Sequence, residues 1–186
     1  MRIYKGNSIV WGALFYAGSG LALAAPAQES EPTSVTSAGP VVSTELVKEL
    51  LHWIGAHSDY DIAVFLDKPP EIAFCECGDT ISYEGETLVV HTPIKGLYDK
   101  KAYKIILVEP WHASDLKNVS TLLHELIHFV QYQSKTWPCW QKTEWEAYKL
   151  QAAWLQEQSL DVNFNWIQIF FKASCEKPRE IHPSRH

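Results

Sequence analysis

The sequence has no long run of lysine and arginine residues. The chain has 186 residues with 16 Lys+Arg against 22 Asp+Glu, a formal net charge of −6. A nucleic-acid partner is therefore not expected, because such proteins neutralise phosphates with a basic patch. The length is that of one domain with extensions, and 46% hydrophobic residues are enough to build a packed core.

A long apolar run is also missing, except near the start of the chain. Arg2 and Lys5 precede the stretch "SIVWGALFYAGSGLALA", which ends in Ala22-Leu23-Ala24. A positive head, a short apolar middle and a small-x-small end are typical of an export signal peptide. We expect residues 1–24 to be removed, which leaves a periplasmic or secreted protein without a membrane segment.

The composition divides the rest of the chain into a linker, a folded domain and a tail. Residues 25–40 are rich in Pro, Ser, Thr, Ala and Glu and are expected to form a flexible linker. The folded domain is predicted to cover 41–176, and 177–186 form a polar tail.

Cysteine is scarce, at four residues: Cys75, Cys77, Cys139 and Cys175. An even number in an exported chain suggests disulfides. A direct Cys75–Cys77 bridge would close a very tight ring. We therefore expect Cys75 and Cys77 each to pair with Cys139 or Cys175. The alternative is a second zinc site, for which the C-x-C spacing is weak evidence.

Hydrophobic periodicity predicts an α+β domain. Helices are expected at 43–58, from about 115 or 118 to 133, and at 143–158. Strands are expected at 60–67, 71–77, 86–93 and 102–109, the last with the strongest signal. The apolar stretch 164–178 fits either a helix or a strand.

The stretch "TLLHELIHFVQY" carries the clearest chemistry. His124 and His128 are one helical turn apart, so both imidazoles can bind one metal ion, and zinc suits this pair. Glu125 is rotated by roughly 100° on the same helix. It can stand beside the metal without binding it and take a proton from water, which is the H-E-x-x-H logic.

In some zinc peptidases the third ligand lies six residues after the second histidine and follows a glycine three residues after that histidine. Here those positions are Ser134 and Gln131, so the third ligand must come from elsewhere in the chain. The following helix offers Glu144 and Glu146, which point apart. Thr143 and Glu146 fit a capping box, so Glu144 is the favoured ligand and Glu146 the alternative.

Two further residues are candidates near the metal. Tyr148, one turn after Glu144, can contact a histidine or stabilise an oxyanion. His112, in the loop before the histidine-bearing helix, is a weaker candidate for the oxyanion role.

The motifs "HELIH" and "EWEAY" resemble the gluzincin-type zinc metallopeptidases, in particular their small minigluzincin-like form. They are also similar to motifs of exported bacterial zincin-like proteins. The resemblance covers about 103–154. It implies a zincin-like fold, with a small mixed or antiparallel sheet, an active-site helix and a following helix that supplies the third ligand.

Carried over residue by residue, the resemblance implies one zinc ion bound by His124, His128 and Glu144, with Glu125 as general base. The family pattern ends in Asp where this chain has Tyr148. The resemblance also implies that strand 102–109 borders the cleft and pairs with an extended peptide substrate.

Two functions follow as hypotheses. The first is an exported zinc-dependent hydrolase, most simply a metallopeptidase. The alternative is a non-catalytic exported protein that binds zinc or a partner through the same site. The presence of Glu125 favours the enzyme, because a purely structural zinc site needs no base. The oligomeric state does not follow from the sequence.

Overall fold

The computed structural model describes residues 40–175, which fall within one compact unit, Ser37–His186. The expected signal peptide at 1–24, almost all of the linker and the polar tail lie outside the described residues. None of the helices in the described part is long and apolar enough to cross a membrane.

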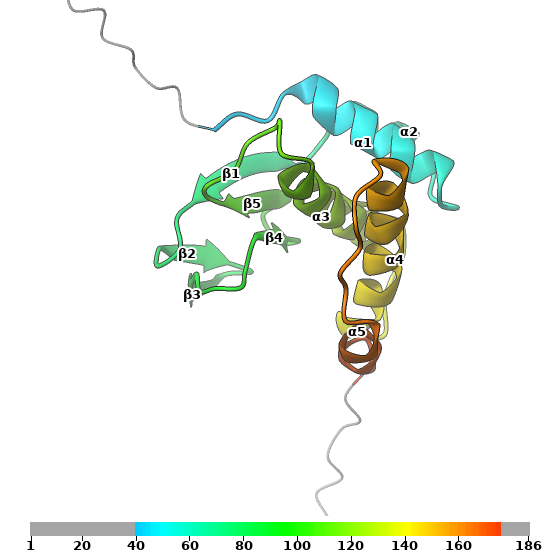
Figure 1. Cartoon of the computed structure of the whole chain (residues 1–186). Coiled ribbons are helices and arrows are strands. Elements are labelled where there is room, and N and C mark those ends of the chain that lie inside the picture. Colours follow the sequence, from blue (N-terminus) through cyan, green and yellow to red (C-terminus); the bar gives the residue numbers. More distant parts are fainter. Residues whose placement is uncertain (1–39, 176–186) are drawn as a thin grey trace, which may run out of the picture. The chain divides into compact units, whose positions relative to one another are not determined.

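The predicted α+β class is confirmed (Figure 1). The elements, in chain order, are α1 Thr44–Ala56, α2 Ala63–Leu66, β1 Glu71–Cys75, β2 Thr80–Tyr83, β3 Glu86–Val89, β4 Gly96–Asp99, β5 Lys104–Val108, α3 Leu116–Ser134, α4 Gln141–Glu157 and α5 Trp166–Lys172.

The main sheet has three strands in the order β1-β5-β4. β1 runs parallel to β5, and β4 runs antiparallel to it, so the predicted mixed sheet is confirmed. The expectation that the strand at 102–109 borders the cleft is wrong. That strand is β5, whose two edges are both paired, and β4 is the edge strand instead.

The alternating side chains of β5 join two cores. Ile105 and Leu107 pack with the helices, while Ile106 and Val108 pack in a smaller cluster with Cys75. Helices α1, α3 and α4 supply most of the larger core. The period of two along β5 therefore anchors α3 against one face of the sheet.

The strand expected at 60–67 is a short helix, α2, because Phe65 is buried against the ring of Phe129 at 5.2 Å. The Asp61 carboxylate accepts a hydrogen bond from the Ala63 backbone N–H at 3.1 Å. This side chain-to-backbone bond offers the chain a turn in place of a sheet ladder.

The expected cysteine pairing is wrong as well. Cys139 and Cys175 form the disulfide, whereas Cys75 and Cys77 are free. Cys75 ends β1 and is buried in the smaller core, and the Cys77 thiol donates to the backbone oxygen of Val90. The disulfide instead joins the segment before α4 to the segment after α5.

Replacing both Cys139 and Cys175 by serine is expected to lower the free energy of unfolding by about 3–4 kcal/mol, because the disulfide closes a loop of 36 residues. Urea unfolding of the full chain measures this loss. The Cys75→Ser/Cys77→Ser variant is the matched control and should keep the bridge. Peptide mapping without reduction that finds Cys75 or Cys77 bridged to Cys139 would contradict the assignment.

Candidate metal centre

Helix α3 carries both histidines on its buried face. It begins after Asp115, whose carboxylate caps the helix by accepting from the Lys117 backbone N–H at 2.9 Å. Of the two expected starts, near 115 or near 118, the structure has the first, and the helix ends one residue after the expected end at 133. His124 and His128 are buried, and their neighbours Leu123, Leu126 and Ile127 on the same helix belong to the main core, which fixes the position of α3.

Helix α4 brings Glu144 to the two histidines. One Glu144 carboxylate oxygen lies 3.6 Å from His124 Nε2, and the other lies 3.4 Å from His128 Nε2. The two Nε2 atoms are 3.1 Å apart. Of the described residues, these three form the one group of His, Cys, Asp and Glu side chains arranged to hold a metal ion.

The spacing of these donor atoms is close to what a tetrahedral metal ion needs. Ligand bonds of about 2.0–2.1 Å place tetrahedral ligand atoms about 3.3–3.4 Å apart. Here the two Nε2 atoms are 3.1 Å apart, and the Nε2 atoms of His124 and His128 lie 3.6 and 3.4 Å from the two different oxygens of the Glu144 carboxylate. The chain therefore offers a metal ion two imidazole nitrogens and one carboxylate, and all three residues line a cavity.

Glu146 lies elsewhere and has other partners. Its carboxylate accepts hydrogen bonds from the Tyr60 hydroxyl and from the Gln131 side-chain amide at 2.8 Å. The expected capping box is wrong, because α4 begins at Gln141 and the Thr143 hydroxyl donates to the backbone oxygen of Trp140. Glu146 is thus held on a different face of α4 from Glu144, with Tyr60 and Gln131 as its partners.

Two buried glutamines, which the sequence interpretation missed, orient the histidine rings. The Gln131 amide nitrogen donates to the Thr143 backbone oxygen and to Glu146, so its Oε1 faces His128 Nδ1 at 3.0 Å. The Gln151 amide nitrogen donates to the Ser120 backbone oxygen, so its Oε1 faces His124 Nδ1, also at 3.0 Å.

This arrangement sets the tautomer of both rings. Because each glutamine oxygen accepts, each histidine in its neutral form carries its proton on Nδ1, and Nε2 is then the nitrogen that can bind a metal. The signal for them was present in the sequence: Gln131 follows His128 by three residues, and Gln151 follows Glu144 by seven. Both spacings keep the side chains on one helical face.

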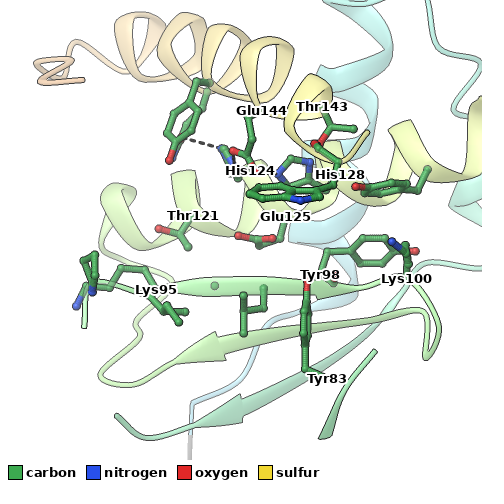
Figure 2. A pocket seen from close by; sticks show the side chains of 18 of the residues that line it. Tyr83, Lys95, Tyr98, Lys100, Thr121, His124, Glu125, His128, Thr143 and Glu144 are labelled. Carbon is green, nitrogen blue, oxygen red and sulfur yellow. Dashed lines mark hydrogen bonds and ion pairs between the residues drawn. The ribbon is translucent and has the colours of Figure 1, made fainter. Parts of the chain in front are cut away.

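Glu125 lies between the histidine pair and strand β4 (Figure 2). Only 7% of its surface is exposed. The approach of β4 depends on Gly96, since a Cβ there would lie 2.9 Å from Glu125 Cγ and 3.0 Å from Oε1. Burial raises the pKa of Glu125, and the nearby histidines only partly oppose this.

Electrostatics link Glu144 to His128. Burial acts against the charged forms of both groups. At Glu144 the hydrogen bonds and charges of His124 and His128 together outweigh it, and at His128 the hydrogen bond and charge of Glu144, together with the charge of Glu125, do the same. The pKa of Glu144 is therefore lowered and that of His128 is raised. A metal must displace the His128 proton, so metal affinity should increase as the pH rises.

A cavity of about 680 Å³ opens onto the site. It is lined by residues of β4, α3, α4 and the β2–β3 hairpin, together with Phe164. Tyr148 lies in this lining, with its ring 4.6 Å from the His124 ring in an edge-to-face contact. His112 is exposed and is not part of the lining, so the structure does not bring it to the site.

The chain matches the model of one protein family. A model described as "Domain of unknown function (DUF6647)" matches residues 39–184. The chain therefore belongs to this family. No curated protein and no solved structure matches the chain at a significant level.

Replacing Gln151 by leucine should weaken zinc binding by about 10- to 100-fold, because the His124 Nδ1–H loses its acceptor and the ring its orientation. Competition with a chromogenic chelator measures the affinity. The exposed Gln156 on the same helix provides the control, Gln156→Leu, whose affinity should match that of the wild type. Equal affinities in all three proteins would show that Gln151 does not support the site.

Proposed function

We propose that this protein is a zinc-dependent hydrolase that cleaves peptide bonds, built on a zincin-like arrangement of the gluzincin type. The observation that carries the proposal is the group of His124, His128 and Glu144 with the Glu125 carboxylate beside it, open to a cavity. The chain supplies three ligands, one candidate base and room for a substrate.

Among the described residues, no strand pairs with the outer edge of β4, and this edge supports a peptide as the substrate. The Val108 backbone N–H donates to the Lys95 oxygen at 3.0 Å, so in this antiparallel ladder Lys95 and Leu97 face β5. The backbone groups of Gly96 face the opposite, free edge and line the cavity. An extended peptide can add to such an edge as a further strand.

In the proposed hydrolysis, the zinc ion and Glu125 have separate roles. Zinc in a site of this kind polarises a carbonyl group and lowers the pKa of water to about 7. Glu125 would accept the proton of the attacking water and deliver it to the leaving amine. Burial raises the pKa of this carboxyl, which favours holding the proton between the two steps.

Tyr148 is the better of the two candidates for stabilising an oxyanion. Burial, with the nearby charges of Glu144 and Glu125, raises the pKa of its hydroxyl. The group therefore keeps its proton at neutral pH and can donate a hydrogen bond into the cavity. The apolar stretch before Ala24 supports export, so the proposed substrates are peptides or proteins outside the cytoplasm.

The test compares the zinc-loaded wild type with Glu125→Gln on a library of fluorogenic peptides. Loss of the base should lower kcat by about 10²- to 10⁴-fold, while the zinc content stays the same because Glu125 is not a ligand. A wild type that holds zinc and cleaves nothing would reject the peptidase in favour of a non-catalytic zinc-binding protein. Equal rates in both proteins would reject the role of Glu125.

A further inference from the structure

Large apolar side chains are exposed together where the start of α4 meets α5. We name this the aromatic surface, and it consists of Trp145, Trp166, Ile167, Phe170 and Phe171. Ile167 and Phe171 are 73% and 71% exposed. Contiguous apolar patches on a folded protein commonly mark a place where another molecule binds.

The aromatic surface is one continuous patch. The Trp145 ring lies 5.8 Å from that of Trp166 and 5.9 Å from that of Phe170, both edge-to-face. Phe170 contacts Phe171 in the same way at 5.9 Å. These separations are those of favourable aromatic pairs, so the side chains form a preorganised surface.

The same series of ring contacts continues into the cavity. Trp166 lies 5.9 Å from Phe164, which lies 5.2 Å from Tyr148, and Tyr148 contacts His124. Phe164 and Tyr148 both line the cavity. An unbroken path of aromatic rings therefore leads from the candidate metal centre to the exposed surface.

The covalent structure fixes this path. After α4 the chain runs back along the helix, and α5 lies at its N-terminal end (Figure 1). The Cys139–Cys175 disulfide then ties the end of the α5 segment to the start of α4. The exposed rings are therefore held at a set distance from the cavity.

The charges beside the aromatic surface are positive. Lys142 and Lys149 are three residues before and four residues after Trp145, on the same face of α4, and Lys172 lies in the last turn of α5.

The acidic side chains of α4 are engaged elsewhere. Glu144 faces the histidines, Glu146 bonds Tyr60 and Gln131, and Glu157 pairs with His57 and Trp53. A ligand segment that is apolar and has acidic residues next to it therefore complements the aromatic surface and its lysines.

We propose that the aromatic surface is a docking site for an apolar, aromatic-containing segment of a polypeptide substrate, with acidic residues beside that segment. The inference rests on the proposed function, since the docked chain would continue along the ring path into the cavity. The surface would select unfolded or flexible substrates, because folded proteins bury such segments.

The test measures the affinity of a fluorescent peptide for the full chain carrying Glu125→Gln, in which the proposed cleavage is blocked. The peptide has about 15 residues, about 50 Å when extended, with Phe and Trp flanked by Glu. Adding Ile167→Ser and Phe171→Ser should weaken binding about 10- to 100-fold. Val64→Ser/Val89→Ser, which changes two exposed side chains elsewhere, should leave the affinity unchanged.

Three results would overturn the proposal. The first is equal affinity in all these proteins, with circular dichroism confirming that each is folded. The second is equally tight binding of a peptide in which serine replaces Phe and Trp.

The third concerns the Ile167→Ser/Phe171→Ser variant. It is an unchanged affinity for the peptide, together with the loss of self-association in sedimentation velocity or of binding to phosphatidylglycerol vesicles. The proposed function is tested separately. A wild type that cleaves no peptide, combined with weaker peptide binding by the Ile167→Ser/Phe171→Ser variant, leaves the docking site intact and rejects only the hydrolase.

Discussion

Two imidazole rings that face one carboxylate across a helix–helix contact are the constraint on which the rest of the structure depends. His124 and His128 lie on the buried face of α3, and Glu144 reaches them from α4. Burying such polar groups is costly unless each finds a partner. Gln131 and Gln151 supply those partners, and no buried side-chain nitrogen or oxygen of the described residues lacks a hydrogen bond.

The three-stranded sheet packs against α3 and brings β4 close to Glu125. β5 alternates its side chains between two cores and so holds α3 and β4 at fixed positions. Gly96 then lets β4 approach Glu125 without a steric clash. The result places a buried carboxylate, a candidate set of metal ligands and a free strand edge around one cavity, which is the arrangement that the proposed peptide hydrolysis needs.

Local patterns in the sequence predicted the three long helices, α1, α3 and α4, and the residues that form the candidate ligand group. The helical spacing of His124, Glu125 and His128 depends only on α3. Glu144 was preferred to Glu146 because of a capping box that the structure does not contain, although Glu144 is the residue that meets the histidines. What local patterns missed depends on tertiary contacts. Phe65 packs on Phe129 and makes α2 a helix, and the edge position of β4 depends on how the sheet pairs.

The cysteine pairing failed for the same reason, because it depends on where α5 returns to α4. The orienting roles of Gln131 and Gln151 require knowing which oxygen meets which ring nitrogen. Spacing restricts such partners to one helical face, but it does not select them.

The most direct measurement of the central claim is the zinc content of Glu144→Ala and Glu146→Ala, by mass spectrometry after gel filtration with a weak chelator. The account predicts one zinc per chain in the wild type and in Glu146→Ala, because Gln131 still donates to the Thr143 oxygen. It predicts no retained zinc in Glu144→Ala. Zinc kept by Glu144→Ala and lost by Glu146→Ala would contradict it.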